Sequence, residues 1–590
     1  MKLLGLDTNK IKTFVDKKNY KYLYIYYFLL VGVNFLEIIG ISSIPFFILS
    51  LTENNISVNY FQFLDLNSLL SKINMRLEIF FGLLIFLIFL IKNIYIIFLS
   101  YYQNKLRLVL RKNLKNKIFQ NYIYSPYQFF LNRNPASLAR NIYLDCNNVV
   151  EVILKLILFF KEFLLLIFIA ILLLIVNPIS SLTIMLILLI TSLTFIYITK
   201  NIMLKTGKNI HTASGSTLVY LQETFGSIKE LKILNKHFFS SKRFNKAMKV
   251  EEQNRATSGF IQSLPRTFLE LVSVTGIVIL IIFLIQQKGS FDLILPTLTL
   301  FVVGMARMIP AYNAITQSVS AIKNLRFSYD FIFEELQSFE RNNEIILKEK
   351  EKNDFPPLKN KIIINNLNFS YQNEKKILKD INLEIKKNTK VGIVGPSGSG
   401  KSTLLDLITG LHSPEKGSIL CDDINIDTNK FGWQKKLGYV PQNIYLLDDT
   451  IKNNVAFGIE EHEINEKLIF ESLEKSQLME FVKSLPEKEN TIIGNNGIRI
   501  SGGQRQRIGI ARALYSDPEI IIFDEATSSL DTENEKKIME DIDKFSKNKT
   551  ILIITHRLNS VINCETVYVL KNGSIVEKGK FKELKLINEF

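Results

Sequence analysis

A glycine-rich loop between a short apolar strand and an apolar helix is the part of the sequence best suited to hold phosphate. Residues 391–394 read Val-Gly-Ile-Val, and residues 395–402 follow as Gly-Pro-Ser-Gly-Ser-Gly-Lys-Ser. The glycines let backbone N–H groups close around phosphate oxygens at a helix N-terminus, Lys401 reaches the β- and γ-phosphates, and the Ser402 hydroxyl holds Mg²⁺. The loop therefore predicts a nucleoside triphosphate site with contacts from Gly395, Ser397, Gly398, Gly400, Lys401, Ser402 and Thr403.

A second apolar strand delivers two carboxylates. Residues 520–523 read Ile-Ile-Ile-Phe and lead directly into Asp524 and Glu525. In a protein that also has a phosphate loop, one such carboxylate is expected to bind Mg²⁺ and the next to orient and deprotonate the attacking water. We therefore expect Asp524 to be a metal ligand and Glu525 to be the general base of phosphate hydrolysis.

Between these motifs lies the run Ser501-Gly502-Gly503-Gln504, and with it the chain resembles the ATP-binding cassette (ABC) family. The resemblance implies that Tyr371 stacks on adenine, that Gln442 senses Mg²⁺ and couples to the membrane part, and that His556 is the switch histidine of the catalytic site. It also implies that Asp531, in the run 528–531, crosses a dimer interface beside ATP. The cassette signature, which contacts ATP in this family, is matched by Ser501, Gly502, Gly503 and Gln504.

The cassette departs from the family pattern in two places. Ile500 stands before the signature where the family usually has Leu, a volume-conserving exchange of small expected effect. Gly494 is followed by Asn495 and Asn496, where exporters of the family usually have an acidic residue. The second departure concerns how the cassette contacts the membrane part and leaves the ATP site unchanged.

The remaining histidines and the cysteines carry no pattern that indicates chemistry. We expect His211, His237, His412 and His462 to be surface residues. Cys146, Cys421 and Cys564 are far apart and form no C-x-x-C pair, so they predict core or solvated thiols, neither a zinc site nor a disulfide framework.

Six apolar stretches are long enough to cross a membrane, since a hydrocarbon core about 30 Å thick needs roughly 20 helical residues. Basic residues gather in 1–21, 103–148 and 201–260, so the positive-inside rule places both termini and two long helical extensions in the cytoplasm. The net charge of +16 follows this topology, and no nucleic-acid partner is expected. The six stretches are residues 22–51, 79–102, 152–176, 179–200, 268–286 and 293–313.

The sequence thus divides into a membrane domain over residues 1–337, a charged linker over 338–359 and a cassette over 360–590. We expect an all-α, six-helix, exporter-type transmembrane domain followed by an α/β phosphate-loop domain that binds ATP and Mg²⁺. By the resemblance, ATP is held between the loop of one cassette and the signature of another. One cassette and six spans make half a transporter, so a homodimer in the bacterial inner membrane is expected.

Ionisable residues inside the spans bear on the cargo. A charge at mid-span costs about 2.5–3.5 kcal/mol on insertion scales, so Lys92 needs a partner or a watery cavity. Arg266 and Glu270 open the fifth span and could form an i, i+4 pair, Arg307 in the sixth could snorkel, and Glu37 lies in the first. Alternatively, the three cations line one cavity and attract a phosphate-bearing substrate.

A narrower resemblance favours the cavity. Residues 265–270, Arg307 followed by Pro310, and the basic Lys92 are similar to bacterial flippases that move lipid-linked oligosaccharides. In those proteins an outer helix meets the lipid tail, and residues 59–73 predict either such an interfacial helix or an apolar loop. The resemblance implies that Lys92, Arg266 and Arg307 bind substrate.

Two other functions stay open on the sequence alone. An exporter of apolar drugs or lipid A-like amphiphiles would have an apolar cavity and tolerate loss of the three cations. An ATP-gated or regulatory membrane protein would bind nucleotide without pumping, but Glu525 and His556 argue against it because a gate can dispense with turnover.

Overall fold

A computed structural model describes residues 8–51, 76–176, 178–286, 291–350, 355–371, 376–494, 497–525, 540 and 548–585. The chain divides into two compact units. The first comprises Met1–Ser125 and Asn132–Arg341, and the second comprises Pro126–Leu131 and Asn342–Phe590. The predicted outer segment, residues 59–73, lies outside the described residues.

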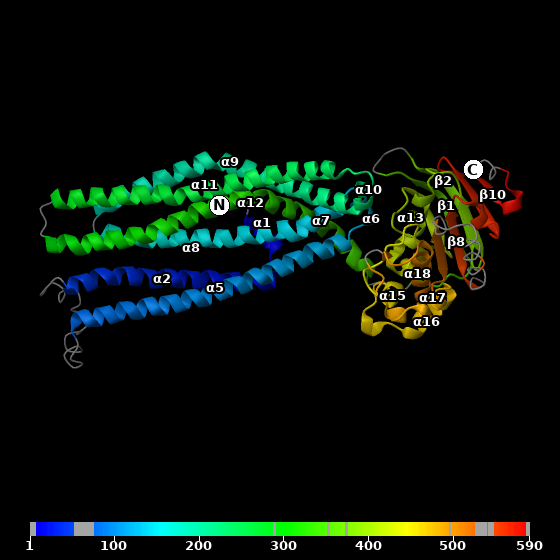
Figure 1. Cartoon of the computed structure of the whole chain (residues 1–590), viewed down its shortest axis with the longest axis horizontal. Helices are drawn as coiled ribbons and strands as arrows, with labels where there is room; N and C mark the ends of the chain where they lie inside the picture. Colours follow the sequence, from blue (N-terminus) through cyan, green and yellow to red (C-terminus); the bar gives the residue numbers. More distant parts are fainter. Residues whose placement is uncertain are drawn as a thin grey trace. The chain divides into compact units, whose positions relative to one another are not determined.

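The first unit consists of helices (Figure 1). Five of them contain candidate membrane spans by length and composition: Lys17–Pro45, Glu78–Ile123, Pro135–Val176, Ser181–Gly226 and Leu298–Phe339. These correspond to five of the six predicted spans, and the other, residues 268–286, lies within α11 without being among them, so the count of six stays a prediction. The helices are α1 (Thr8–Phe14), α2 (Tyr20–Leu51), α5 (Leu77–Ile123), α7 (Pro135–Arg140), α8 (Cys146–Val176), α9 (Pro178–Gly226), α10 (Ile228–Ile233), α11 (His237–Gln286) and α12 (Phe291–Lys350).

The long helices extend well beyond a membrane core. At 1.5 Å per residue, the 47 residues of α5 measure about 70 Å, against a hydrocarbon thickness of about 30 Å. The α9 and α11 helices pack side by side (Figure 1). Close approach is also needed between α9 and α12, since a Cβ at Gly207 would lie only 2.0 Å from the carbonyl oxygen of Asn324. The α12 helix continues to Lys350, so part of the predicted linker is helical.

A buried polar cluster ties the extensions together. Asp145 accepts a hydrogen bond from Ser328 at 2.7 Å and lies 3.3 Å from both Arg140 and His211. Arg140 also donates to the backbone oxygen of His211 at 3.1 Å. Residues Asn141–Asp145 form a π-helix, which presents Asp145 to partners on α7, α9 and α12. His211 is buried, so the expectation of a surface residue is wrong there, whereas His237 is exposed as expected.

The second unit contains two sheets. The smaller sheet has the order β2-β1-β4-β5, from β1 (Lys361–Phe369), β2 (Leu378–Lys386), β4 (Lys416–Cys421) and β5 (Ile424–Asn425), all antiparallel. The larger sheet has the order β10-β9-β3-β8-β7-β6, in which only β10 is antiparallel. Its strands are β3 (Lys390–Val394), β6 (Leu437–Val440), β7 (Ile520–Asp524), β8 (Thr550–Thr555), β9 (Thr566–Lys571) and β10 (Ser574–Gly579).

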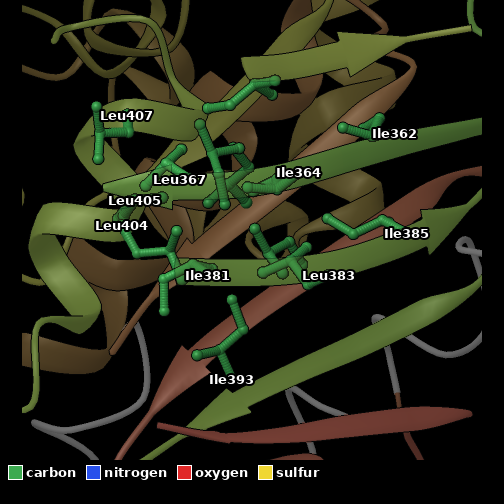
Figure 2. Close-up of a cluster of buried hydrophobic side chains, with 14 of the residues drawn as sticks. Ile362, Ile364, Leu367, Ile381, Leu383, Ile385, Ile393, Leu404, Leu405 and Leu407 are labelled. Carbon is green, nitrogen blue, oxygen red and sulfur yellow. The ribbon is translucent and has the colours of Figure 1, made fainter. Parts of the chain in front are cut away.

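The central strands of the larger sheet, β9, β3, β8 and β7, are buried on both faces, as near-continuous apolar strands predict. Alternate residues of β7 point to opposite faces: Ile520 and Ile522 join the core with β1, β2 and α13 (Lys401–Ile408), whereas Ile521 and Phe523 join the core beneath α18 (Gly502–Tyr515). Figure 2 shows the first core, with side chains from β1, β2, β3 and α13 pointing toward one another. This packing fixes the strand ends that carry the predicted chemistry.

Four helices of the second unit surround a separate core. The apolar faces of α15 (Ile451–Val455), α16 (Glu466–Lys475), α17 (Met479–Ser484) and α18 share that cluster. The other helices of the unit are the short α6 (Tyr127–Leu131) and α14 (Lys430–Gln434). Since α18 contributes to both cores, it joins this helical part to the larger sheet.

The buried Asp145 gives a test of stability. Asp145→Ala is expected to destabilise the protein by about 3–5 kcal/mol, because the change leaves the Arg140 guanidinium buried without its carboxylate. The midpoint of thermal unfolding of the full chain in detergent measures the effect. Glu252→Ala is the matched control, since this exposed carboxylate lies 3.7 Å from Arg255 and its loss should change stability by less than about 1 kcal/mol. Equal losses in both variants would contradict the role of the buried cluster.

Candidate functional site

The glycine-rich loop follows β3 and ends at the first residue of α13. Gly398 and Gly400 have φ of +79° and +103°, a left-handed backbone that residues with a Cβ rarely adopt. Gly395 has no room for a side chain, because a Cβ there would lie 2.1 Å from the carbonyl oxygen of Leu570. The sequence of glycines thus sets the loop that leads into the N-terminus of α13, where backbone N–H groups can receive an anion.

Lys401 lies folded across this loop. Its Nζ donates hydrogen bonds to the carbonyl oxygens of Gly395 and Pro396, at 2.9 Å each. Burial lowers the pKa of Lys401, and the carboxylates of Glu525 and Asp524 oppose that shift. A buried cation held mainly by neutral carbonyls is well prepared to exchange them for phosphate oxygens.

Asp524 is the last residue of β7, and it lies at the edge of the sheet where β3 leads into the glycine-rich loop. The hydroxyl of Tyr439 donates to Asp524 Oδ2 at 3.1 Å. Burial raises the pKa of Asp524, and burial raises the pKa of Asp406 to about 6 with a further contribution from Asp524. A divalent cation beside Asp524 would stabilise the charged carboxylate. The carboxylate of Asp524, the Ser402 hydroxyl at the start of α13 and the Gln442 amide supply oxygen atoms, which are the ligands that Mg²⁺ prefers.

The predicted catalytic residues meet at Glu525. Gln442 Nε2 donates to Glu525 Oε2 at 2.7 Å, and His556 Nδ1 lies 3.0 Å from Glu525 Oε1. Glu525 has φ of +47°, a conformation that costs of order 1–3 kcal/mol for a residue with a side chain. Its backbone N–H donates to the Ile554 carbonyl on β8 at 2.8 Å, which holds that conformation. The geometry holds one carboxylate between an amide and an imidazole, with both carboxylate oxygens engaged.

An aromatic cluster lies beside the loop. The Tyr371 hydroxyl is 3.5 Å from Thr403 Oγ1, and its ring packs edge-on against Phe369 and His412 at centroid distances of 5.0 and 5.5 Å. His412 is buried, and burial lowers its pKa with help from Lys430. The expectation of a surface residue is therefore wrong for His412. Its packing partners are distant in sequence, and only the fold brings them to the ring predicted to stack on adenine.

The signature caps a helix in the same unit. Ser501 is the N-cap of α18, and Ser501 and Gln504 exchange side-chain and backbone hydrogen bonds in a capping box. A Cβ at Gly502 would meet nothing within 4 Å, so this end of the helix is open. Among the described residues, no hydrogen bond or ion pair joins 501–504 to the loop at 395–402. Asp531, Asn495 and Asn496 lie outside the described residues, and His462 is exposed as expected.

Three predicted substrate residues lie in the helical unit. Arg307 forms a bidentate ion pair with Glu37, in which its Nε donates to Glu37 Oε2 at 2.8 Å. Lys92 Nζ lies 4.5 Å from the centre of the Phe89 ring. Arg266 is exposed on α11, and in the described part of the chain it forms no ion pair with Glu270 or with the other two cations. The three predicted substrate residues therefore have different partners: Arg307 contacts Glu37, Lys92 contacts Phe89, and Arg266 is exposed.

Sequence reasoning missed a further pair. Lys161 and Glu162 are buried in the middle of α8, and their charged groups lie 2.7 Å apart. The sequence could have indicated this pair, because residues 161 and 162 are two adjacent, oppositely charged residues inside the otherwise apolar third predicted span. The three free cysteines are buried, so of the two expected environments, core or solvent, the core is the one observed.

Comparisons with known proteins agree with the two-part fold. A family model described as "ABC transporter" matches residues 378–528, and one described as "ABC transporter transmembrane region" matches residues 23–312. A bacterial Atm1-family ABC exporter with ATP bound has a similar structure, with a TM-score of 0.76 and 19% identity over 95% of this chain and 96% of that one. At that identity the likeness shows the fold, a helical membrane region followed by an α/β cassette, as predicted from the sequence.

Curated relatives are similar over a shorter span. An ATP-dependent lipid A-core flippase of Coxiella burnetii is 31% identical over 388 residues, which cover 64% of this chain and 63% of the relative. The heterocyst differentiation ATP-binding protein HepA of Nostoc sp. is 33% identical over 364 residues, which cover 61% of this chain and 58% of the relative. The chain thus spans less than two thirds of the length of either relative.

Asp406 gives a pH-dependent prediction. Its folded-state pKa of about 6 exceeds the ordinary 3.8, so stability falls as pH rises between these values and the loss is complete above them. Asp406→Asn should therefore gain stability relative to the parent as pH rises from about 5 to 7, and the gain should level off above that. Thermal unfolding of the full chain across this range measures it, with the exposed Asp423→Asn as control. A difference that does not vary with pH would contradict the raised pKa.

Proposed function

The chain belongs to the family of ABC transporters, and from this premise we propose that it is a half-transporter in which ATP hydrolysis drives export or flipping of a phosphate-bearing lipid. The observation that carries the catalytic part is the position of Glu525, which contacts both Gln442 and His556 directly after the strand that presents Asp524. A nucleotide-gated protein without turnover has no need of such a strained and doubly engaged carboxylate.

The hydrolytic step follows from the named atoms. With ATP on the glycine-rich loop, a water held by Glu525 attacks the γ-phosphorus in line, and Glu525 accepts its proton as the P–O bond to the β-phosphate breaks. Lys401 exchanges its carbonyl partners for β- and γ-phosphate oxygens and offsets their charge. Ser402, Asp524 and Gln442 would hold Mg²⁺, which would supply charge neutralisation at the transferred group. His556 keeps the carboxylate oriented, and Tyr371 stacks on the adenine.

We propose a homodimer with two ATP sites. The open end of α18 has no contact with the loop of its own chain among the described residues, which is the arrangement expected if 501–504 complete the site of a second copy. Asp531 would then lie at the same interface. Both termini and both helical extensions face the cytoplasm of a bacterium in this proposal, because the basic segments gather there.

The proposed cargo is a lipid-linked oligosaccharide or a related phosphate-bearing lipid. The similarity to proteins named lipid A-core flippases supports a lipid cargo, and Lys92, Arg266 and Arg307 support an anionic headgroup. The alternative is an apolar drug or lipid, for which the charged residues would be structural. The ion pair between Arg307 and Glu37 is the observation that favours this second candidate.

The catalytic proposal predicts a separation of binding from turnover. Glu525→Gln should retain ATP binding while ATP hydrolysis falls by at least about 100-fold, because the amide cannot accept the proton of water. Fluorescent nucleotide binding and phosphate release, measured on the same preparation, give the two quantities. Glu474→Gln, which removes an exposed carboxylate on α16, should leave both near the parent values. If Glu525→Gln hydrolysed ATP at the parent rate, Glu525 would not be the general base.

The cargo proposal predicts a flipping defect at Lys92. In proteoliposomes, ATP-dependent flipping of a labelled lipid-linked oligosaccharide should fall about tenfold in Lys92→Ala, since a lost charge-assisted contact is worth about 1.5–3 kcal/mol. Lys105→Ala removes an exposed cation from the same helix and should flip normally. Brisk ATP hydrolysis without flipping in the parent protein would discard this cargo and favour the apolar alternative.

A further inference from the structure

Ionisable side chains from four helices gather at the middle of the predicted spans. They come from α2, α5, α8 and α12, and each lies within a stretch that is otherwise apolar. Charges at such depth are costly unless they are paired or line a watery cavity. The group consists of Glu37, Lys92, Lys161, Glu162 and Arg307, and we call it the mid-span charge cluster.

The first pair of this cluster is Glu37 with Arg307. Glu37 is 3% exposed, and it receives two hydrogen bonds from the guanidinium, one from Nε at 2.8 Å and one from Nη2. The Arg307 side chain is 32% exposed, so part of it stays accessible. Bidentate pairing is the strongest common arrangement for a carboxylate, and it is also the geometry with which arginine binds phosphate.

The second pair is Lys161 with Glu162. Both side chains are buried, and their charged groups are 2.7 Å apart. The α2 helix is joined to this place, because Asn34 Nδ2 donates to the Lys161 carbonyl at 2.9 Å. Asn34 lies one turn before Glu37, so a single face of α2 serves both pairs. This second pair is therefore a structural link.

Lys92 is the remaining member. It forms no ion pair with a carboxylate in the described part of the chain, although it interacts electrostatically with Glu37, Arg307 and Lys161. Its ammonium group lies over the Phe89 ring at 4.5 Å, a contact that only partly replaces water. Three cations and two carboxylates leave the cluster with one excess positive charge, and that charge is at Lys92.

We propose that Glu37 is an internal counter-ion that competes with the cargo's phosphate for Arg307 and so determines which anionic lipids bind. This rests on the proposed function. A phosphate group that reaches Lys92 can displace Glu37 from the Arg307 guanidinium, and two cations then hold the anion. When the phosphate leaves, Glu37 takes its place again. A neutral lipid cannot displace Glu37, and a headgroup with several negative charges displaces it most readily.

The test uses farnesyl pyrophosphate as probe and farnesol as its neutral counterpart. Binding to the full chain in nanodiscs is measured for the parent, Glu37→Gln and Lys92→Ala. Glu37→Gln should bind farnesyl pyrophosphate about tenfold more tightly, equivalent to about 1.4 kcal/mol, because Arg307 is released from its competitor. Lys92→Ala should bind it about tenfold more weakly. Farnesol should bind all three proteins equally. Glu78→Gln, a carboxylate at the start of α5, is the matched control and should match the parent.

The outcomes separate this inference from the proposed function. If the parent binds the pyrophosphate no better than farnesol, the anionic cargo is wrong. If the parent prefers the pyrophosphate and Glu37→Gln leaves its affinity unchanged or weaker, the cargo survives and the competition is wrong. Should Glu37→Gln fail to fold, Glu37→Asp replaces it, since the shorter carboxylate reaches Arg307 less well and should shift affinity in the same direction. In the Glu37→Gln/Arg307→Gln variant, the tighter binding must disappear.

Discussion

The catalytic geometry depends on the parallel register of three neighbouring strands. Because β3, β7 and β8 run in the same direction and end within one residue of one another, the residue that follows each strand lies at one edge of the sheet. These residues are Gly395, which opens the phosphate loop, Glu525 and His556. Burial of both faces by apolar side chains holds the register, since a slip of one residue would turn each strand's side chains to the wrong face. The chemistry is thus positioned by a core that contains none of it.

The charged groups of both units differ in whether a carboxylate lies close to them. Arg140 is buried beside Asp145, a carboxylate that also contacts His211 and Ser328, and this kind of pairing stabilises the structure. Lys401 and Lys92 differ, because among the described residues neither has a carboxylate within ion-pair distance, and each is held by weaker partners. One rests on loop carbonyls and the other on an aromatic ring. Lys401 is buried and Lys92 is partly buried, and a cation with such weak partners is prepared for an incoming anion.

Much of the cassette could be predicted from the sequence, because its chemistry is encoded locally. A glycine-rich loop after an apolar strand, or two acids at a strand end, requires only neighbouring residues to be recognised, and the contacts among Gln442, Glu525 and His556 agree with that. The pairing of Arg307 with Glu37 could not be predicted, since the two lie on helices separated by most of the membrane domain. The burial of His211 and His412 was missed for the same reason, as periodicity does not show which side chains meet from distant segments. The roles at 59–73 and at Asp531 stay predictions.

The π-helix at Asn141–Asp145 has a consequence for how the chain can vary. An α-helix advances about 100° per residue, so one additional residue within a turn rotates everything beyond it by that amount. Deletion of a single residue here could restore a regular helix and would turn α7 relative to the apolar face of α8. Insertions and deletions in this family of chains should therefore be rare at this turn and, where found, should occur together with a changed residue at the position of His211. At this point of the sequence the number of residues in the turn is constrained, as well as the identity of their side chains.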